Sequence, residues 1–238
     1  PLTSEQFADQ SAFTGWDFTS TWTMSNWLGR PVLKSSIEGG SGTEEDPYII
    51  PDLEMLEKFR DSVNSGTTYV GEYIKLTDNI DMSESYGETA GKDDAAVSWT
   101  PIGDRSHSFQ GNFNGGGYEI SGLYINNSEA NYQGLFGYLG PGGTIHELGV
   151  SGLVAGGYSA GGVVGYSRGD VSACYNACTV TGSSATGGVV GSSSGSVGGS
   201  YNIGSVIVTG DNAGGVIGYN FGDVSSCYNA GTVEGGLN

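Results

Sequence analysis

The last third of this chain repeats one sequence block at a nearly constant interval, and this repeat restricts the possible folds more than any other feature. The block reads Gly-Gly-Val-Val-Gly or Gly-Gly-Val-Ile-Gly, with copies at 161–165, 187–191 and 214–218. The last glycines are separated by 191 − 165 = 26 and 218 − 191 = 27 residues. A fixed period of this size, rich in Val, Ile, Tyr and Gly, is typical of a stacked β-solenoid.

A second block follows each copy after a glycine turn and ends in the pair Tyr-Asn. The recurring residues are Tyr175, Tyr201, Tyr228, Asn176, Asn202 and Asn229. Side chains at one repeat position stack on top of each other in a solenoid, and aligned asparagines can form a ladder of amide hydrogen bonds. We therefore predict a structural ladder at these positions. A surface row of ligand-binding residues is the functional alternative.

Glycine is the outlier of the composition, with 44 of 238 residues. It does not recur at every third position, which excludes collagen. A disordered tract would also be rich in glycine, but these glycines stand at fixed places between Val-Val and Tyr-Asn pairs. Such apolar periodicity favours an ordered fold.

The charge balance is strongly acidic, with 8 − 26 = −18. Phosphate backbones and anionic membrane surfaces repel such a chain, so we expect no nucleic-acid partner. No apolar run reaches the ~18 residues of a membrane span, so we expect no membrane insertion within this fragment. We expect no cofactor; loose calcium binding at the acidic runs 44–46 and 93–94 is the alternative.

The three cysteines are Cys174, Cys178 and Cys227, and an odd number cannot form a fully paired disulfide framework. Cys174 and Cys227 occupy the same repeat position two coils apart, roughly 9.5 Å at ~4.8 Å per strand spacing. A disulfide needs Cα atoms within ~7 Å. We therefore expect inward-facing core cysteines, and a Cys174–Cys178 bridge remains open if a turn lies between them.

The chain divides into three predicted segments. Residues 1–37 hold a short helix near Ser4–Asp9 and an aromatic cluster, interpreted as a small core or cap, with a sugar-binding platform as the alternative. Residues 38–66 form a loop and an amphipathic helix from about Pro51 to Ser65, which covers the open end of the stack. Residues 67–238 form the solenoid, with regular repeats from residue 134 and an acidic loop at 83–97 that leaves the stack.

These residues resemble the GLUG motif of bacterial surface proteins. The similarity rests on the Gly-Gly-Val-Val-Gly blocks with their later Tyr-Asn, on residues 109–123, and on residues 42–50 with the following helix. Such regions occur in filamentous-haemagglutinin-like adhesins and in immunoglobulin-A-protease-type exported proteins. The resemblance implies an all-β, right-handed parallel β-helix with one N-terminal capping helix. It supplies no catalytic residue.

The order of the segments departs from that family pattern. Residues 15–34 look like the segment that usually follows the last repeat of such a unit, yet here they come first. We interpret residues 1–37 as the tail of a preceding unit, or as a cap that packs beside this unit or on the open end of a neighbouring copy. The hypothesis therefore includes end-to-end self-association.

Catalysis has to be weighed, because β-helices also host polysaccharide lyases and hydrolases. Asp170 and Asp223 share a turn position two coils apart, which is at the limit of the ~5–9.5 Å that a hydrolase carboxylate pair spans. A glycine–aspartate pair is also an ordinary tight-turn signature. His107 and His146 have no partners at zinc-site spacing. We therefore expect no catalytic and no metal-binding residues.

The sequence thus predicts a non-catalytic adhesion or stalk module of an exported bacterial protein, located outside the cell or at its surface. We expect it to bind a host or environmental glycan or an extracellular protein through loops such as 83–97 and 126–133. A polysaccharide-active enzyme and an accessory domain of an exported peptidase are the alternatives.

Overall fold

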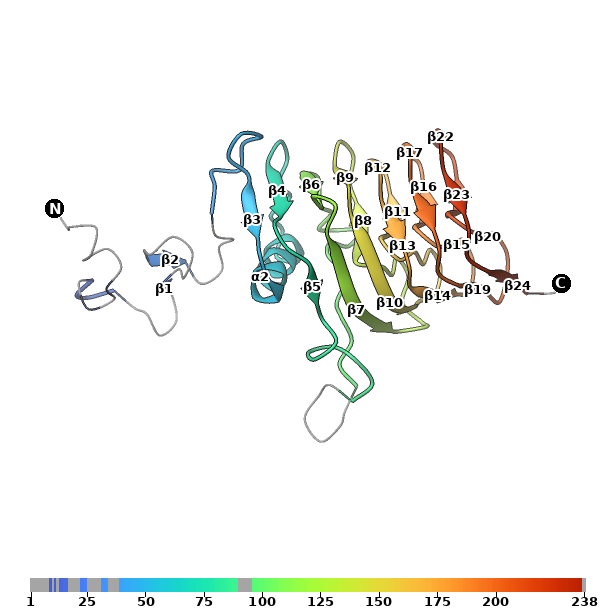
Figure 1. The fold of residues 1–238 in the computed structure, drawn as a ribbon, viewed down its shortest axis with the longest axis horizontal. Helices are drawn as coiled ribbons and strands as arrows, with labels where there is room; N and C mark the ends of the chain where they lie inside the picture. Colours follow the sequence, from blue (N-terminus) through green and yellow to red (C-terminus); the bar gives the residue numbers. More distant parts are fainter. Residues whose placement is uncertain are drawn as a thin grey trace.

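The glycine-rich repeats form the coils of a parallel β-solenoid, which confirms the all-β fold class expected from the sequence (Figure 1). The computed structural model describes residues 39–89 and 96–236, together with residues 9, 11, 13–16, 22–24 and 31–33. The helix predicted near Ser4–Asp9 and the cap predicted for residues 1–37 fall largely outside this described set. Upstream of the solenoid, β1 (Trp22–Met24) and β2 (Pro31–Leu33) pair in antiparallel fashion.

Three long sheets run along the solenoid, and each successive coil adds strands to them. The seven-stranded sheet contains β3 (Tyr48–Ile50), β4 (Tyr73–Leu76), β6 (Asn112–Asn114), β9 (Thr144–His146), β12 (Asp170–Ser172), β17 (Val197–Gly198) and β22 (Val224–Ser225). The four-stranded sheet contains β8 (Phe136–Leu139), β11 (Val164–Ser167), β16 (Val190–Ser193) and β21 (Ile217–Asn220). A short two-stranded sheet joins β15 (Thr186–Gly187) to β20 (Ala213–Gly214).

The nine-stranded sheet is the broadest surface of the solenoid. It contains β5 (Ile80–Asp81), β7 (Glu119–Asn126), β10 (Gly149–Ala155), β13 (Tyr175–Asn176), β14 (Thr179–Gly182), β18 (Tyr201–Asn202), β19 (Val206–Val208), β23 (Tyr228–Asn229) and β24 (Val233–Gly235). Its two long strands, β7 and β10, pair with each other, and β10 pairs on its other side with the two shorter strands β13 and β14 of the next coil. The later coils therefore have an extra corner, which the asparagine of each Tyr-Asn pair occupies.

The register explains why valine recurs at fixed positions. Val171 lies between Ile145 and Val197 in the seven-stranded sheet, and Val164 lies between Phe136 and Val190 in the four-stranded sheet. All six side chains are buried in one continuous core. One coil is too small to bury these side chains alone, so stacking supplies the apolar contacts that each coil lacks.

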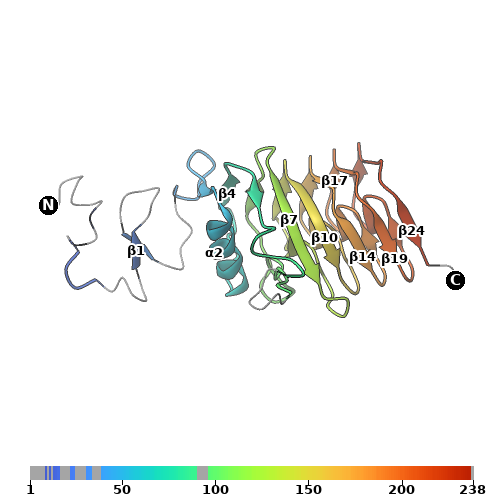
Figure 2. The ribbon, with the colours of Figure 1, turned by 60° about the horizontal axis from the view of Figure 1, so that its bottom comes forward.

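The single α-helix of the described residues, α2 (Leu53–Asn64), lies across the N-terminal end of the stack (Figure 2). The side chain of Asp52 caps it by accepting a hydrogen bond from the Met55 amide, so the helix starts two residues after the predicted Pro51. Ser65 is the C-cap, and Lys58 forms an ion pair of 3.0 Å with Glu54 one turn earlier. A single helix thus covers strand ends that would otherwise expose apolar core.

Aromatic side chains seal this end of the core. Phe59 of α2 contacts Tyr69, Phe109, Phe113 and Phe136, with ring centroids 5.3 to 6.4 Å apart. Burying one phenylalanine side chain contributes about 1.5–3 kcal/mol. The largest fully buried side chains all precede residue 137, whereas the later coils are filled by valine, cysteine and asparagine. The core therefore becomes thinner and more polar towards the C-terminal end.

Residues 83–89 and 96–97, the described parts of the predicted loop at 83–97, run outside the sheets, and residues 90–95 lie outside the described residues (Figure 1). The base of the loop is closed by an antiparallel bridge in which Gly87 and Val97 exchange backbone hydrogen bonds of 3.0 and 2.8 Å. The short strand β5, which comprises only Ile80 and Asp81, precedes this loop. The chain re-enters the core at Trp99, which is buried.

Candidate functional site

The three asparagines of the Tyr-Asn pairs are joined into a ladder inside the solenoid. Asn176 Nδ2 donates to Asn202 Oδ1, and Asn202 Nδ2 donates to Asn229 Oδ1, each at 2.7 Å. Each amide nitrogen also donates to the carbonyl two residues further along the chain, at Cys178, Gly204 and Gly231. Asn176 and Asn202 are fully buried, so these side chains hold a corner of the coil and do not contact solvent.

The second glycine of each repeat block makes room for this ladder. A Cβ atom placed on Gly162 would collide with the Asn176 side-chain oxygen, and Gly188 and Gly215 face Asn202 and Asn229 in the same way. A larger residue at these glycines would push the asparagine out of its position. The two blocks of the repeat are therefore coupled by direct packing of glycine against asparagine.

The three tyrosines stack on the outer side of the same corner. The rings of Tyr175 and Tyr201 lie 5.3 Å apart at 14°, and those of Tyr201 and Tyr228 lie 4.9 Å apart at 4°. Sugars stack on exposed aromatic faces, but the rings in this row cover each other's faces. The row therefore presents ring edges and hydroxyl groups to solvent, with only Tyr228 more than half exposed, at 56%.

The first tyrosine of the row is anchored to a glutamate two coils away. The Tyr175 hydroxyl donates to Glu119 Oε2 at 2.9 Å, and the Ser151 hydroxyl donates to Glu119 Oε1. The ring passes directly over Gly149 of the coil between them, where any Cβ would collide with it. Burial, together with the hydrogen bond and negative charge of Glu119, raises the pKa of Tyr175 to about 12.

The cysteines are core residues and form no disulfide. Cys174 and Cys178 are fully buried free thiols, so the alternative of a bridge between them is wrong. Burial raises the pKa of the Cys174 thiol to about 12 and that of Cys178 further above its ordinary value. Cys227 is a free thiol in the last described coil and is partly exposed. The buried thiols are protonated at neutral pH and poorly suited to nucleophilic chemistry.

The two aspartates considered as a hydrolase pair stand at the same corner of their coils, Asp170 as the first residue of β12 and Asp223 directly before β22. Asp170 Oδ1 accepts a hydrogen bond from the Ser196 amide of the next coil at 3.0 Å. The backbone carbonyl of Asp223 in turn accepts one from the Val197 amide at 2.8 Å. The two residues therefore connect successive coils, in agreement with the tight-turn interpretation.

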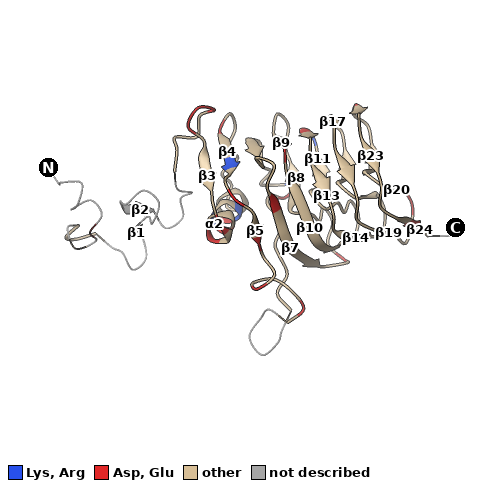
Figure 3. Ribbon diagram, in the orientation of Figure 1, with Lys and Arg blue, Asp and Glu red and all other residues tan. Residues whose placement is uncertain are grey.

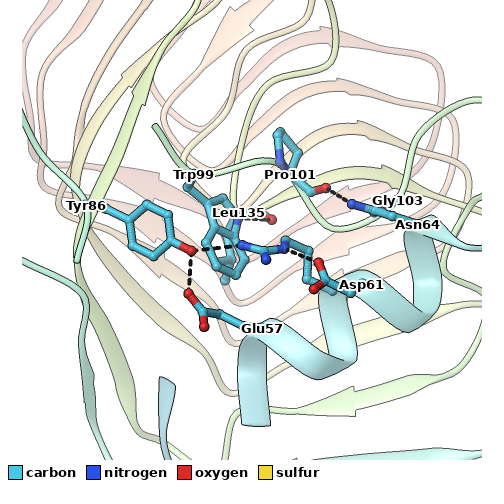
Figure 4. Close-up of polar contacts among 9 residues, drawn as sticks. Glu57, Asp61, Asn64, Tyr86, Trp99, Pro101, Gly103 and Leu135 are labelled. Carbon is cyan, nitrogen blue, oxygen red and sulfur yellow. Dashed lines mark hydrogen bonds and ion pairs between the residues drawn. The ribbon is translucent and has the colours of Figure 1, made fainter. Parts of the chain in front are cut away.

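A polar network ties the loop at 83–97 to helix α2, and sequence patterns gave no sign of it (Figure 4). The Arg60 guanidinium lies 4.5 Å from the centre of the Trp99 ring, and it donates to the Tyr86 hydroxyl at 2.9 Å and to Asp61 at 2.8 Å. Tyr86 in turn donates to Glu57 at 2.5 Å. The network fixes the base of the loop against the helix. Its partners lie 26 to 39 residues apart along the chain, so no local sequence pattern could indicate it.

The described residues hold neither a metal-binding cluster nor a membrane-spanning helix. Within residues 39–89 and 96–236, no group of three or more His, Cys, Asp or Glu side chains is arranged to hold a metal ion. The acidic run 44–46 lies in an exposed turn before β3, and the run 93–94 lies outside the described residues. No helix in the part of the chain that the structure describes is long and apolar enough to cross a bilayer.

Comparison with known proteins gives relatives that are far longer than this chain. No family model matches it. Over 120 residues, half of the chain, it is 38% identical to a protein of Evansella cellulosilytica named "Putative Gly-rich membrane protein", and it covers 12% of that protein. Over 142 residues it is 32% identical to "Halomucin" of Haloquadratum walsbyi, of which it covers 1%. The chain thus spans a small fraction of the length of both relatives.

A solved structure shares the fold. The crystal structure of a "putative immunoglobulin A1 protease" from Bacteroides ovatus matches with a TM-score of 0.60 over 82% of this chain and 60% of that chain. The two sequences are 23% identical. At this identity the similarity establishes a common β-solenoid architecture and carries no information about activity.

Proposed function

We propose that this chain is a non-catalytic module of an exported, surface-located protein, and that it acts as an adhesive or stalk segment. The names of its relatives, a membrane protein and a halomucin, support a surface location. The β-solenoid fold, which an immunoglobulin-A1-protease-like structure shares, suits the exported proteins that the glycine-rich repeats resemble. In this proposal the repeats are of the GLUG type.

The observation that carries the proposal is how the polar groups of the coils are used. Buried asparagines hydrogen-bond from coil to coil, tyrosines stack on tyrosines, and Asp170 and Asp223 link adjacent turns. These groups hold the stack together along its length, which suits a rigid spacer. The segments 83–97 and 126–133, which were expected to be loops, are the first candidates for contact with a partner.

An array of glycans and extracellular-matrix proteins, probed with the labelled chain with and without calcium, tests this proposal. We expect selective binding to a small number of spots, and loss on calcium removal would reveal a metal requirement. A variant with residues 128–131 replaced by Gly-Ser-Gly-Ser tests the loop, because these residues follow β7 in an exposed turn. Binding to no spot would refute the adhesive role and leave only the stalk role.

A further inference from the structure

The outer side of the nine-stranded sheet forms a continuous face over the last coils, here called the tyrosine face. It comprises the outward side chains of β13, β14, β18, β19, β23 and β24 and the residues between them. Buried Asn202 and Val206 alternate along the chain with outward Tyr201, Ile203 and Ser205. Ile203 is 51% exposed in the middle of this face, although the buried core lies directly behind it.

The tyrosine face is almost uncharged on a chain with a net charge of −18. Of the 26 acidic residues only five follow residue 133, namely Glu147, Asp170, Asp211, Asp223 and Glu234. Figure 3 shows acidic residues gathered around α2 and the loops of the N-terminal half, whereas the later coils carry few charges. Two acids lie at this face: Glu119 accepts the Tyr175 hydroxyl at its edge, and Glu234 of β24 stands in the last described coil in register with Ile207. A cationic polymer would be drawn to the N-terminal half, so a partner of this face is itself uncharged.

The polar groups of the face repeat once per coil. Strands of neighbouring coils are ~4.8 Å apart, and the Tyr201 and Tyr228 rings lie 4.9 Å apart. A second row runs beside the tyrosines, where the Thr232 hydroxyl donates to the Ser205 hydroxyl at 2.9 Å. Hydroxyl groups at a constant spacing, with the apolar side chain of Ile203 between the rows, match a ligand that is itself periodic, hydroxylated and amphipathic.

We propose that the tyrosine face binds an uncharged polysaccharide chain that lies along the solenoid axis. In an extended polysaccharide, successive sugar rings repeat at a spacing close to one coil, so each sugar meets an equivalent set of hydroxyl groups. The C–H faces of the sugars pack on Ile203 and on the tyrosine edges, and the hydroxyl rows exchange hydrogen bonds with them. This inference rests on the proposed adhesive function and adds a surface distinct from the loops.

Binding to soluble neutral polysaccharides, such as a mannan and a β-glucan, is measured by titration calorimetry, with polygalacturonate as the acidic comparison. We expect binding to a neutral polymer only, with an affinity that is nearly the same at low and high salt because no charges meet. Ile203→Glu and Ile203→Lys should each weaken it at least about tenfold, since both bury a charge under the sugar. Val70→Glu is the matched control, because Val70 is 66% exposed in the turn before β4.

Polysaccharide binding at the tyrosine face and adhesion in general can be refuted by different results. Neutral-polysaccharide binding that survives both Ile203 substitutions, or that disappears only in the 128–131 loop variant, would refute the tyrosine face as the binding site. The proposed adhesive function would still hold. Matrix-protein binding without polysaccharide binding would lead to the same conclusion. Self-association in sedimentation velocity that Ile203→Glu abolishes, without polysaccharide binding, would assign the face to a second copy of the chain. Circular dichroism confirms that each variant is folded.

Discussion

Replacing Asn202 by alanine tests whether the buried amide ladder stabilises the later coils. The Asn202 side chain makes four hydrogen bonds, accepting from Asn176 Nδ2 and the Gly204 amide and donating to the Gly204 carbonyl and Asn229 Oδ1. Alanine leaves one hydrogen of the buried Asn176 amide and the partly buried Gly204 carbonyl without partners. An orphaned buried group costs about 1–3 kcal/mol, so we expect a loss of about 3 kcal/mol in the free energy of unfolding.

The measurement is urea unfolding followed by far-UV circular dichroism, together with hydrogen–deuterium exchange. Exchange is needed because a solenoid can lose single coils before it unfolds as a whole. The faster exchange should be confined to the coil around Asn202 and its neighbours. Asn229→Ala is the comparison variant, because Asn229 itself is exposed: water can replace its bond to the Gly231 carbonyl, and only one hydrogen of the buried Asn202 amide loses its partner. Equal losses for the two variants, within about 0.5 kcal/mol, would refute the ladder as a source of stability.

Three further predictions concern the tyrosine row and the thiols. Gly149→Ala should destabilise the protein by about 1–3 kcal/mol, because the new methyl group overlaps the Tyr175 ring, and thermal unfolding measures this loss. A thiol reagent should label Cys227 alone in the native protein and all three cysteines in denaturant, because Cys174 and Cys178 are buried; early labelling of all three would contradict the core assignment. The folded protein holds the Tyr175 proton more tightly than the unfolded chain, so this contribution to stability is complete below about pH 10 and is lost as pH rises towards 12. Melting temperatures between pH 9 and 11.5 should fall less steeply in Tyr175→Phe than in the unmodified protein.

The coil architecture could be predicted because apolar residues recur along the sequence at the interval of one coil. Val164, Val190 and Ile217 recur at the repeat interval, and the structure places them in one register. The capping helix was equally visible, since Leu56, Phe59 and Val63 define one apolar face and all three are buried. Each of these signals lies within a window of one repeat or one helix. Local patterning and tertiary packing agree at these positions.

Other features depend on contacts that no local pattern encodes. The bond between Tyr175 and Glu119 spans 56 residues, and it forms because the ring leans over a glycine of the intervening coil. Ala173, Gly199 and Ser226 occupy the same corner of successive coils. Ala173 and Ser226 adopt positive φ angles of 50° and 54° there, although glycine, present only at position 199 of these three, is the residue expected for this conformation. Stacking forces all three into the same corner geometry, which overrides the individual preference of each residue.

The aromatic cluster around Phe59 makes the two ends of the solenoid different. One end of the stack is closed by a helix that cannot accept another coil, and the other end carries the strand edges of β21 to β24 in the register of every coil before them. A duplicated repeat of 26 or 27 residues inserted among the later coils would therefore lengthen the rod by ~4.8 Å and leave the sealed end unchanged. The reach of such a protein can change in small equal steps by recombination between repeats, without any redesign of the part that starts the fold.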